Sequence, residues 1–479
     1  HARFTPAVGA LDTTFGNGGR VVSNFGNLGT NFSQERGRAT AVQTDGKILV
    51  GGAVFSSSEN TSSSSIAGLA RYNADGSLDL RFGAGGFFTT QLLSEIRGVL
   101  ALPNGKILIT GPTYRTPSGT TGANGTPSMG VVQLLSDGSI DTTGFGNRGL
   151  AFVQFQDTNT TANVSSTPYA ITLQTVAATQ FIVVAGEAFN STGSTDFGVA
   201  RFTMNGNLDN TFNSKGYQVV DFPATATDLD RAYDVKVDSQ SRIVLAGRTK
   251  SSTTGTANGG GALNFDFALA RLTPNGTLDT NFGTQGKVFT DFGQGQDDEA
   301  FSVVVQTGDN YVAGGYTRFN RGNGGAGGAS DDDFALARYN SNGQLQGGFG
   351  NNGKQITDFS NGPTSDDRIG KLALQTDGKV VAVGSAYETY ASSNNYPQRL
   401  LAVARYDGSS GAIDTSLNPN TGGRNTFQFF GFTETTGAAI ALQADGKWVV
   451  AGTTGRTTDG NTVDTFYGSS YGNFALARF

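Results

Sequence analysis

Short apolar segments alternate with polar, turn-forming residues along the whole chain. Segments rich in Val, Ile, Phe, Thr and Ala are separated by clusters of Gly, Asn, Asp, Ser and Thr. Long runs with apolar residues at helical spacing are absent from the sequence. This pattern predicts many short β-strands that are joined by turns.

The predicted strands belong to a repeat. A motif of the form Leu-Asp-x-x-Phe-Gly recurs, with some degeneracy, at spacings of 62 to 70 residues. Its seven copies begin at Leu11, Leu78, Ile140, Leu208, Leu278, Leu345 and Ile413. A fixed period of this kind is typical of repeat architectures. We therefore expect residues 1–479 to form one array of seven units rather than a series of unrelated domains.

The sequence of each unit predicts four antiparallel strands, which are called a to d. Strands a and b flank an Asp-Gly-Lys turn such as Asp45-Gly46-Lys47, where a two-residue hairpin loop with positive φ is expected. Strand c carries Phe-Ala-Leu-Ala-Arg-Tyr, as in Phe334–Tyr339, and strand d follows the Leu-Asp-x-x-Phe-Gly motif. Large residues on one face and small ones on the other suit sheets covered on both sides. The sequence thus predicts an all-β, seven-bladed β-propeller.

The order of the motifs predicts how the ring closes. The segment Gly19–Phe25 has the character of a strand d, and Phe474–Phe479 has that of a strand c. We expect the last blade to combine this N-terminal strand d with the C-terminal strands a to c. Such a closure removes the open edges of the array.

At these motifs the chain resembles the delta-60 repeat family of bacterial secreted and surface proteins. The matching segments are Asp266–Arg271, Leu278–Gly283 and Gln443–Gly452. The resemblance covers essentially the whole chain. It implies a propeller fold and an exported bacterial protein, extracellular or on the cell surface, and it supplies no catalytic residues.

Composition excludes several classes of function. The chain has no Cys and a single His, which rules out thiolate chemistry, Cys-based metal sites and an internal Ser-His-Asp triad. A formal net charge of -6 argues against a nucleic-acid partner. No apolar run is long enough for a transmembrane segment.

The long, polar b–c loops, together with the d–a loops, are expected on one face of the disc. The predicted b–c loops are residues 54–65, 112–128, 187–195, 248–264, 316–332, 385–399 and 453–472. Long loops on one face of a rigid scaffold commonly carry recognition. The alternative is that these loops are solvated spacers.

The first candidate site is a set of charged residues at the entry to strand a. Its members are Glu35, Arg36, Glu95, Asp230, Arg231, Asp298, Glu299, Asp367 and Arg368. Such a ring of charges at the mouth of a central channel can hold a polar ligand or a cation. We favour the alternative that acid–Arg pairs link neighbouring blades.

A second candidate site is aromatic. Its members are Tyr387, Tyr390, Tyr396, Phe466, Tyr467 and Tyr471, which lie in two neighbouring b–c loops. Exposed aromatic rings suit sugar rings or a protein partner. The alternative, given equal weight, is that these rings fold back over the edge of a blade.

A third candidate is the run Asp331-Asp332-Asp333, whose carboxylates can bind Ca²⁺. Its spacing differs from that of an EF-hand loop, so we expect no cofactor, with Ca²⁺ as the alternative. The pairs Arg71 with Asp79 and Arg271 with Asp279 recur across the repeat, and we interpret them as structural. The repeated Phe residues, such as Phe82 and Phe282, are interpreted as core residues.

Taken together, the sequence favours a non-catalytic binding module for adhesion or carbohydrate binding, with a glycan or a surface protein as partner. One alternative is a structural subunit of a surface assembly that binds copies of itself or its neighbours. A polysaccharide-active enzyme with a carboxylate pair is the third hypothesis. No blade carries a set of polar residues that the others lack entirely, which favours binding or structure.

Overall fold

We describe the fold from a computed structural model. It describes residues 9–28, 32–56, 65–114, 126–157, 160, 162–190, 193–222, 229–250, 264–293, 297–320, 330–359, 366–388, 398–429, 434–456 and 471–479. Within these residues the secondary structure is almost entirely β-strand. None of the described helices has the length and apolar character needed to span a membrane.

The strands form seven four-stranded antiparallel blades. The innermost strands are β2 (Phe32–Val42), β6 (Gly98–Ala101), β12 (Ser166–Val176), β16 (Arg231–Val237), β20 (Asp298–Gln306), β24 (Arg368–Leu374) and β28 (Glu434–Leu442). The second strands are β3 (Ile48–Ser56), β7 (Ile107–Thr113), β13 (Thr179–Phe189), β17 (Ile243–Lys250), β21 (Asn310–Asn320), β25 (Val380–Glu388) and β29 (Trp448–Arg456).

The two outer positions of each blade follow the same order. The third strands are β4 (Ser65–Tyr72), β8 (Ser128–Leu134), β14 (Thr195–Thr203), β18 (Phe265–Leu272), β22 (Ser330–Tyr339), β26 (Gln398–Tyr406) and β30 (Tyr471–Arg478). The outermost strands are β5 (Phe87–Thr90), β9 (Leu150–Val153), β15 (Tyr217–Val220), β19 (Lys287–Thr290), β23 (Lys354–Thr357), β27 (Arg424–Phe427) and β1 (Arg20–Ser23). A small hairpin, β10 (Phe155–Gln156) with β11 (Asn163–Val164), follows β9. The described residues also contain the 3₁₀ turns η1 (Phe25–Leu28), η2 (Phe212–Ser214), η3 (Thr415–Leu417) and η4 (Pro419–Thr421).

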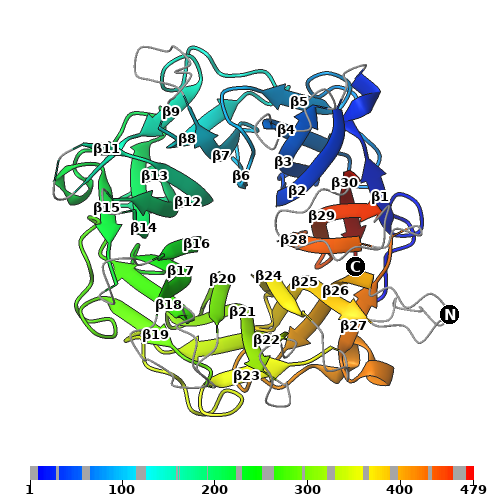
Figure 1. The fold of residues 1–479 in the computed structure, drawn as a ribbon. Helices are drawn as coiled ribbons and strands as arrows, with labels where there is room; N and C mark the ends of the chain where they lie inside the picture. The colour runs from blue at the N-terminus through cyan, green and yellow to red at the C-terminus, as the bar shows by residue number, and fades with distance from the viewer. Residues whose placement is uncertain are drawn as a thin grey trace.

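The blades stand side by side around a central axis, and the ring closes as the sequence predicts (Figure 1). Strand β1 pairs antiparallel with β30, with Arg20 opposite Ala477. The last blade therefore combines one N-terminal strand with three C-terminal strands, and the seven-bladed fold is confirmed. A single parallel bridge between Arg399 and Glu434 also joins the sixth and seventh blades into one sheet.

The Asp-Gly-Lys turns differ in one detail from the expected two-residue loops. The Gln43 N–H donates to the Lys47 carbonyl at 2.8 Å, and the Gly46 N–H donates back to the Gln43 carbonyl at 2.9 Å. Only Gly46 has a positive φ, of 82°. The loop is thus one residue longer than a type I′ hairpin, and a single glycine supplies the left-handed residue that it needs.

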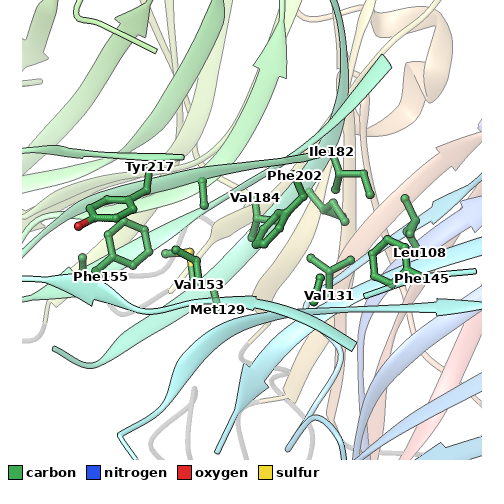
Figure 2. Close-up of a cluster of buried hydrophobic side chains, with 14 of the residues drawn as sticks. Leu108, Met129, Val131, Phe145, Val153, Phe155, Ile182, Val184, Phe202 and Tyr217 are labelled. Atoms are coloured by element: carbon green, nitrogen blue, oxygen red, sulfur yellow. The ribbon is translucent and has the colours of Figure 1, made fainter. Parts of the chain in front are cut away.

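The hydrophobic core lies between blades rather than at the centre of the ring. Figure 2 shows the cluster between the second and third blades, where Met129 and Val131 of β8 face Ile182 and Val184 of β13. Phe202 of β14 lies among them and is fully buried. Because each blade is covered on both faces, its strands read as continuous apolar runs.

A second contact between blades is repeated around the ring and is called here the arginine clamp. In the clamp of the fourth blade, Arg271 Nε donates to Asp279 Oδ2 at 2.8 Å, and the guanidinium lies 4.6 Å from the centre of the Phe282 ring. Arg271 Nη1 reaches the Ser341 carbonyl in the next blade. The Phe282 ring packs under Gly343 of the same turn.

Equivalent clamps occur elsewhere in the ring. Arg71 pairs with Asp79 at 2.8 Å and Arg201 with Asp209 at 2.6 Å. These pairs are buried and hold one blade to the turn of the next. The structural interpretation of the repeated Arg, Asp and Phe residues is therefore confirmed.

Candidate functional site

The predicted charged pairs at the entry to the inner strands divide into two groups, because successive strand residues face opposite ways. The first members, Glu35, Asp230, Asp298 and Asp367, are buried. Each accepts the backbone N–H of a Phe that ends the preceding blade: Asp298 from Phe292 at 2.7 Å, Asp367 from Phe359 at 2.8 Å, Glu35 from Phe25 at 2.9 Å and Asp230 from Phe222 at 3.1 Å. These carboxyls join consecutive blades.

Burial has a large effect on the protonation of three of these carboxyls. Desolvation raises the pKa of Glu35 to about 7, although it accepts the Phe25 N–H. Desolvation also raises the pKa of Asp298 and of Asp367 to about 8, although the backbone N–H groups that donate to each carboxyl act to lower that pKa. Near neutral pH, these sites therefore hold a proton or need a compensating charge.

The second members face the central axis. Arg36, Arg231, Glu299 and Arg368 line a cavity of about 640 Å³ at the centre of the ring. Arg231 pairs with Glu187 of the previous blade at 2.5 Å, and Glu299 pairs with Arg248 at 2.7 Å. Arg368 pairs with Asp332 of the previous blade. The ion pairs between neighbouring blades that the sequence favours are present.

Glu95 is also placed in this ring of charges. It forms an ion pair with Arg38 at 2.7 Å and accepts a hydrogen bond from Arg97 Nε at 2.5 Å. Burial alone would raise the pKa of Glu95, but the two guanidinium groups outweigh it and hold that pKa below its usual value. Glu95 is therefore an ionised acceptor between two blades.

The lining of the cavity is strongly cationic. Its described residues include nine Arg or Lys side chains and two carboxylates. The cationic members are Arg36, Arg38, Arg97, Arg231, Lys236, Arg248, Arg368, Lys371 and Arg399. These cations pair with five carboxylates, namely Glu95, Glu187, Asp234, Glu299 and Asp332. The channel therefore keeps an excess of positive over negative side chains, in a chain with a formal charge of -6. A concave site lined by one sign of charge focuses its field on an oppositely charged ligand.

Aromatic side chains form an arc along the same lining. The Tyr169 and Tyr233 rings meet edge to face at 5.2 Å, and Tyr233 and Phe301 lie 4.9 Å apart. Phe301 in turn stacks on Tyr316 at 5.9 Å. Tyr169, Tyr233 and Phe301 are half-buried and line the cavity.

Cationic groups lie over both ends of this arc. The Arg97 guanidinium lies 4.4 Å from the Tyr169 ring centre, and that of Arg368 lies 4.5 Å from the Tyr316 ring centre. The channel thus offers flat apolar surfaces beside fixed positive charges.

Arg399, at the start of β26, differs from the paired arginines. Its side chain is buried, with 3% exposed, yet it lines the cavity. Nε and Nη2 have no hydrogen-bond partner among the described residues, and the guanidinium lies over the Tyr387 ring at 4.5 Å. The charge of Arg399 also acts on the Asp366 carboxylate, where it opposes the rise in pKa that burial causes. The two free N–H groups of the guanidinium can still receive an acceptor from a ligand.

The two carboxylates that line the cavity are already engaged. Asp234 accepts from Lys236 at 2.9 Å and from Lys371 at 2.8 Å. Burial would raise the pKa of Asp234, but these two ammonium groups keep it below its usual value. Glu299 accepts from Arg248, Tyr233 and Tyr316. Both carboxylates therefore already accept hydrogen bonds from side chains of the chain itself.

Most of the predicted aromatic site lies outside the described residues. This applies to Tyr390, Tyr396, Phe466 and Tyr467, and only the backbone of Tyr471 is described. Tyr387 is described and lies under Arg399.

The carboxylates of the run Asp331–Asp333 take different partners. Asp332 pairs with Arg318 at 2.8 Å and with Arg368, whereas Asp333 lies beside Asp358 and Asp367. Asp331 is buried in β22 beside them.

Several channel residues escape sequence reasoning, notably Arg38, Arg97, Tyr169, Tyr233 and Phe301. A usable signal was present for four of them, because Arg38, Arg97, Tyr233 and Phe301 each lie two residues beyond a member of the charged ring. They therefore face the same side of the strand as that member. Arg248 and Arg399 lie on the second and third strands and carry no comparable signal.

Four segments of the chain match a protein-family model described as "Domain of unknown function (DUF5122) beta-propeller". They are residues 43–82, 102–143, 182–212 and 241–282. The match indicates a propeller repeat family without singling out the delta-60 repeats. No curated protein matches the chain.

Among solved structures, a polysaccharide lyase, Uly1, is 9% identical with a TM-score of 0.45, covering 92% of this chain and 89% of that one. An ulvan lyase of polysaccharide lyase family PL25 is 11% identical with a TM-score of 0.47, covering 93% and 94%. The GH93 α-L-arabinofuranosidase of Fusarium graminearum is 10% identical with a TM-score of 0.40, covering 79% and 91%. Similarities of this size carry no information on what the chain binds.

Proposed function

We propose that this β-propeller is a non-catalytic binding module that takes an acidic glycan, carboxylated or sulfated, into the mouth of its central channel. The observation that carries the proposal is the Arg399 guanidinium, whose Nε and Nη2 have no hydrogen-bond partner among the described residues, in a cavity lined by cationic and aromatic side chains. Carboxylate and sulfate groups accept two parallel N–H bonds from a guanidinium, whereas sugar rings stack on aromatic faces.

The arrangement of the lining supports a glycan over a neutral ligand or a bare ion. The arc Tyr169, Tyr233 and Phe301 extends across three consecutive blades, which suits an extended chain of rings. Arg97 and Arg368 at its ends would recognise acidic substituents on successive sugars. The saturated state of Asp234 and Glu299 supports binding without hydrolysis.

The setting of this activity follows from the same proposal. We place the protein outside the cell or on its surface, as the resemblance to delta-60 repeats implies, where acidic polysaccharides are available as partners. The absence of Cys and the polar Ser, Thr and Gly content of the sequence are compatible with this location.

The test is a glycan array that contains uronate-bearing, sulfated and neutral oligosaccharides, probed with the wild type and with the Arg399→Gln variant. Hydrogen bonds to charged groups contribute about 1.5–3 kcal/mol. We therefore expect the variant to bind acidic glycans roughly 10- to 150-fold more weakly. Thermal unfolding of the wild type and of the variant shows whether the variant keeps its fold, so that a loss of binding can be assigned to the missing guanidinium.

The matched control is Arg81→Gln, which removes an exposed cation from a turn outside the channel. This variant should bind as the wild type does. Absence of acidic-glycan binding by the wild type, or equal binding by the Arg399→Gln variant, would refute the proposal.

A further inference from the structure

The contact between two consecutive blades, called here a seam, carries an ion pair beside the channel at four places in the ring. Each pair joins a guanidinium of one blade to a carboxylate of the neighbouring blade. The pairs are Arg38 with Glu95, Arg231 with Glu187, Arg248 with Glu299 and Arg368 with Asp332. At these seams the protein supplies both charges itself.

The seam between the sixth and seventh blades has hydroxyl side chains at the positions of such a pair. Ser385 in β25 has the register of Glu187 in β13, because each lies opposite the third-strand residue that pairs with the last residue of the outermost strand. Thr436 lies directly before the residue at which the register of its inner strand shifts, as Arg231 does in the fourth blade. Ser385 and Thr436 therefore stand where the third seam has its ion pair, and they cannot form one.

These short side chains leave a gap, and the channel cavity extends into it. Ser385 on the second strand and Thr436 on the inner strand both line the cavity. Among the described lining residues, Arg399 is the one that comes from a third strand, so the cavity reaches furthest from the axis at this seam. The gap thus leads from the channel to the Arg399 guanidinium.

The Arg399 guanidinium offers an edge that suits a carboxylate. Nε and Nη2, the two atoms without a hydrogen-bond partner among the described residues, form one edge of the guanidinium and donate parallel N–H bonds. The chain uses this edge elsewhere, because Arg318 Nε lies 2.8 Å from Asp332 Oδ1 and its Nη2 lies 3.4 Å from Oδ2. The Tyr387 ring, 4.5 Å from the Arg399 guanidinium, supports its plane.

We propose that this gap is the subsite for the carboxylate of a uronic acid residue, and that the acidic glycan is therefore a uronate-bearing chain. The ligand carboxylate takes the place of the acid that the protein itself supplies at the other four seams. It accepts two parallel N–H bonds from Arg399 and the hydroxyl protons of Ser385 and Thr436. This inference rests on the proposed function, and it adds the acidic group that is recognised and the residues that select it.

The experiment is calorimetric titration of the wild type and the Ser385→Glu variant with a uronate oligosaccharide. The substitution places at this seam the acid that the third blade carries as Glu187, so an internal carboxylate fills the gap and pairs with Arg399. We expect binding to weaken at least roughly 10-fold, since the ligand loses its charge-assisted hydrogen bonds. The milder variant Ser385→Ala keeps the gap and removes one donor, and it should bind about 2- to 10-fold more weakly.

The matched control for the protein is Ser136→Glu, which adds the same charge at an exposed serine of a turn outside the channel and should bind as the wild type does. The matched controls for the ligand are the same oligosaccharide with its carboxyls reduced to alcohols, and that reduced chain after sulfation. Both should bind the wild type more weakly than the uronate chain. Thermal unfolding shows whether each variant keeps its fold.

The outcomes separate this inference from the proposed function. Equal binding of the uronate chain by the wild type and the Ser385→Glu variant would overturn the subsite and leave acidic-glycan binding intact. Equal binding of the sulfated and uronate chains would overturn the assignment of a carboxylate. If no glycan binds, but free glucuronate raises the unfolding midpoint of the wild type and not of the variant, the proposed function fails and the subsite stands. If neither ligand acts on the wild type, both are refuted.

Discussion

Replacing Asp279 by Asn tests whether the arginine clamp holds neighbouring blades together. The substitution leaves Arg271, whose side chain is 1% exposed, without its charged partner. Breaking a buried ion pair by removing one partner costs about 3–5 kcal/mol. The Arg271 bonds to Tyr311 and to the Ser341 carbonyl remain, and Asn can still accept the Asn281 N–H. We therefore expect a loss of about 2–3 kcal/mol in the free energy of unfolding.

The assay is thermal unfolding followed by circular dichroism at pH 7. With an unfolding entropy of about 2.1 cal/mol/K per residue, a chain of 479 residues loses roughly 1 °C in midpoint for each kcal/mol. The expected decrease is therefore about 2–3 °C. A decrease below about 0.5 °C would show that the clamp contributes packing but no electrostatic stabilisation, and would refute the reasoning.

The fifth blade supplies the reverse experiment. There Arg338 donates to Gln346 and Gln306 at 2.8 Å each, and burial lowers the pKa of Arg338. The Gln346→Asp variant restores the pair found in other blades. We expect it to raise the midpoint by about 1 °C. A decrease would mean that the amide pair at this seam is already the better partner.

Three further predictions concern the backbone, pH and ring closure. Gly138→Ala should lower the free energy of unfolding by about 2–4 kcal/mol. Gly138 has φ of +91°, and an added Cβ would lie 2.7 Å from the Phe82 ring. Equilibrium denaturation measures this loss. The pKa of Glu35 is raised to about 7, so its contribution to stability is present at low pH and is lost as pH rises through 7. The wild type should therefore lose up to about 1.4 kcal/mol per pH unit between pH 6 and 7 relative to Glu35→Gln, as unfolding midpoints at the two pH values would show. Removal of residues 1–23 deprives β30 of its outer partner, and size-exclusion chromatography should then detect oligomers formed through the open edge; a monomeric product would contradict this role of β1.

The fold was predictable because each of the seven repeats meets the same physical requirements with similar residues. Each blade needs small residues opposite large ones, a glycine with positive φ in its turn and a Phe beneath the next blade, so motifs such as Phe-Ala-Leu-Ala-Arg recur. The closing strand could be placed from motif order alone. The turn length after Gln43 was missed, because Asp-Gly is compatible with more than one hairpin loop.

The candidate site was only partly predictable. The sequence located the charged ring at the entry to strand a, and it placed Arg231 and Arg368 where they line the channel. The sequence alone could not show that the Asp298 side chain is buried between two blades while the Glu299 side chain faces the central axis. That distinction requires the register of the strand. Arg399 was missed because its place beside the channel, at the start of the third strand of its blade, follows from three-dimensional packing.

The repeat separates positions that serve the fold from positions that are free to differ between blades. Positions that serve the propeller keep their residues around the ring, as Arg71, Arg201 and Arg271 do in the clamp. Positions facing the axis are free of that requirement, and there the blades differ: Arg38, Arg97, Tyr169, Tyr233 and Phe301 occupy equivalent places. A residue that served only to hold the blades together would be expected to stay the same from blade to blade, as the clamp residues do. The asymmetry of the channel lining is therefore the property expected of a surface that matches a ligand with no sevenfold symmetry, such as a polysaccharide chain.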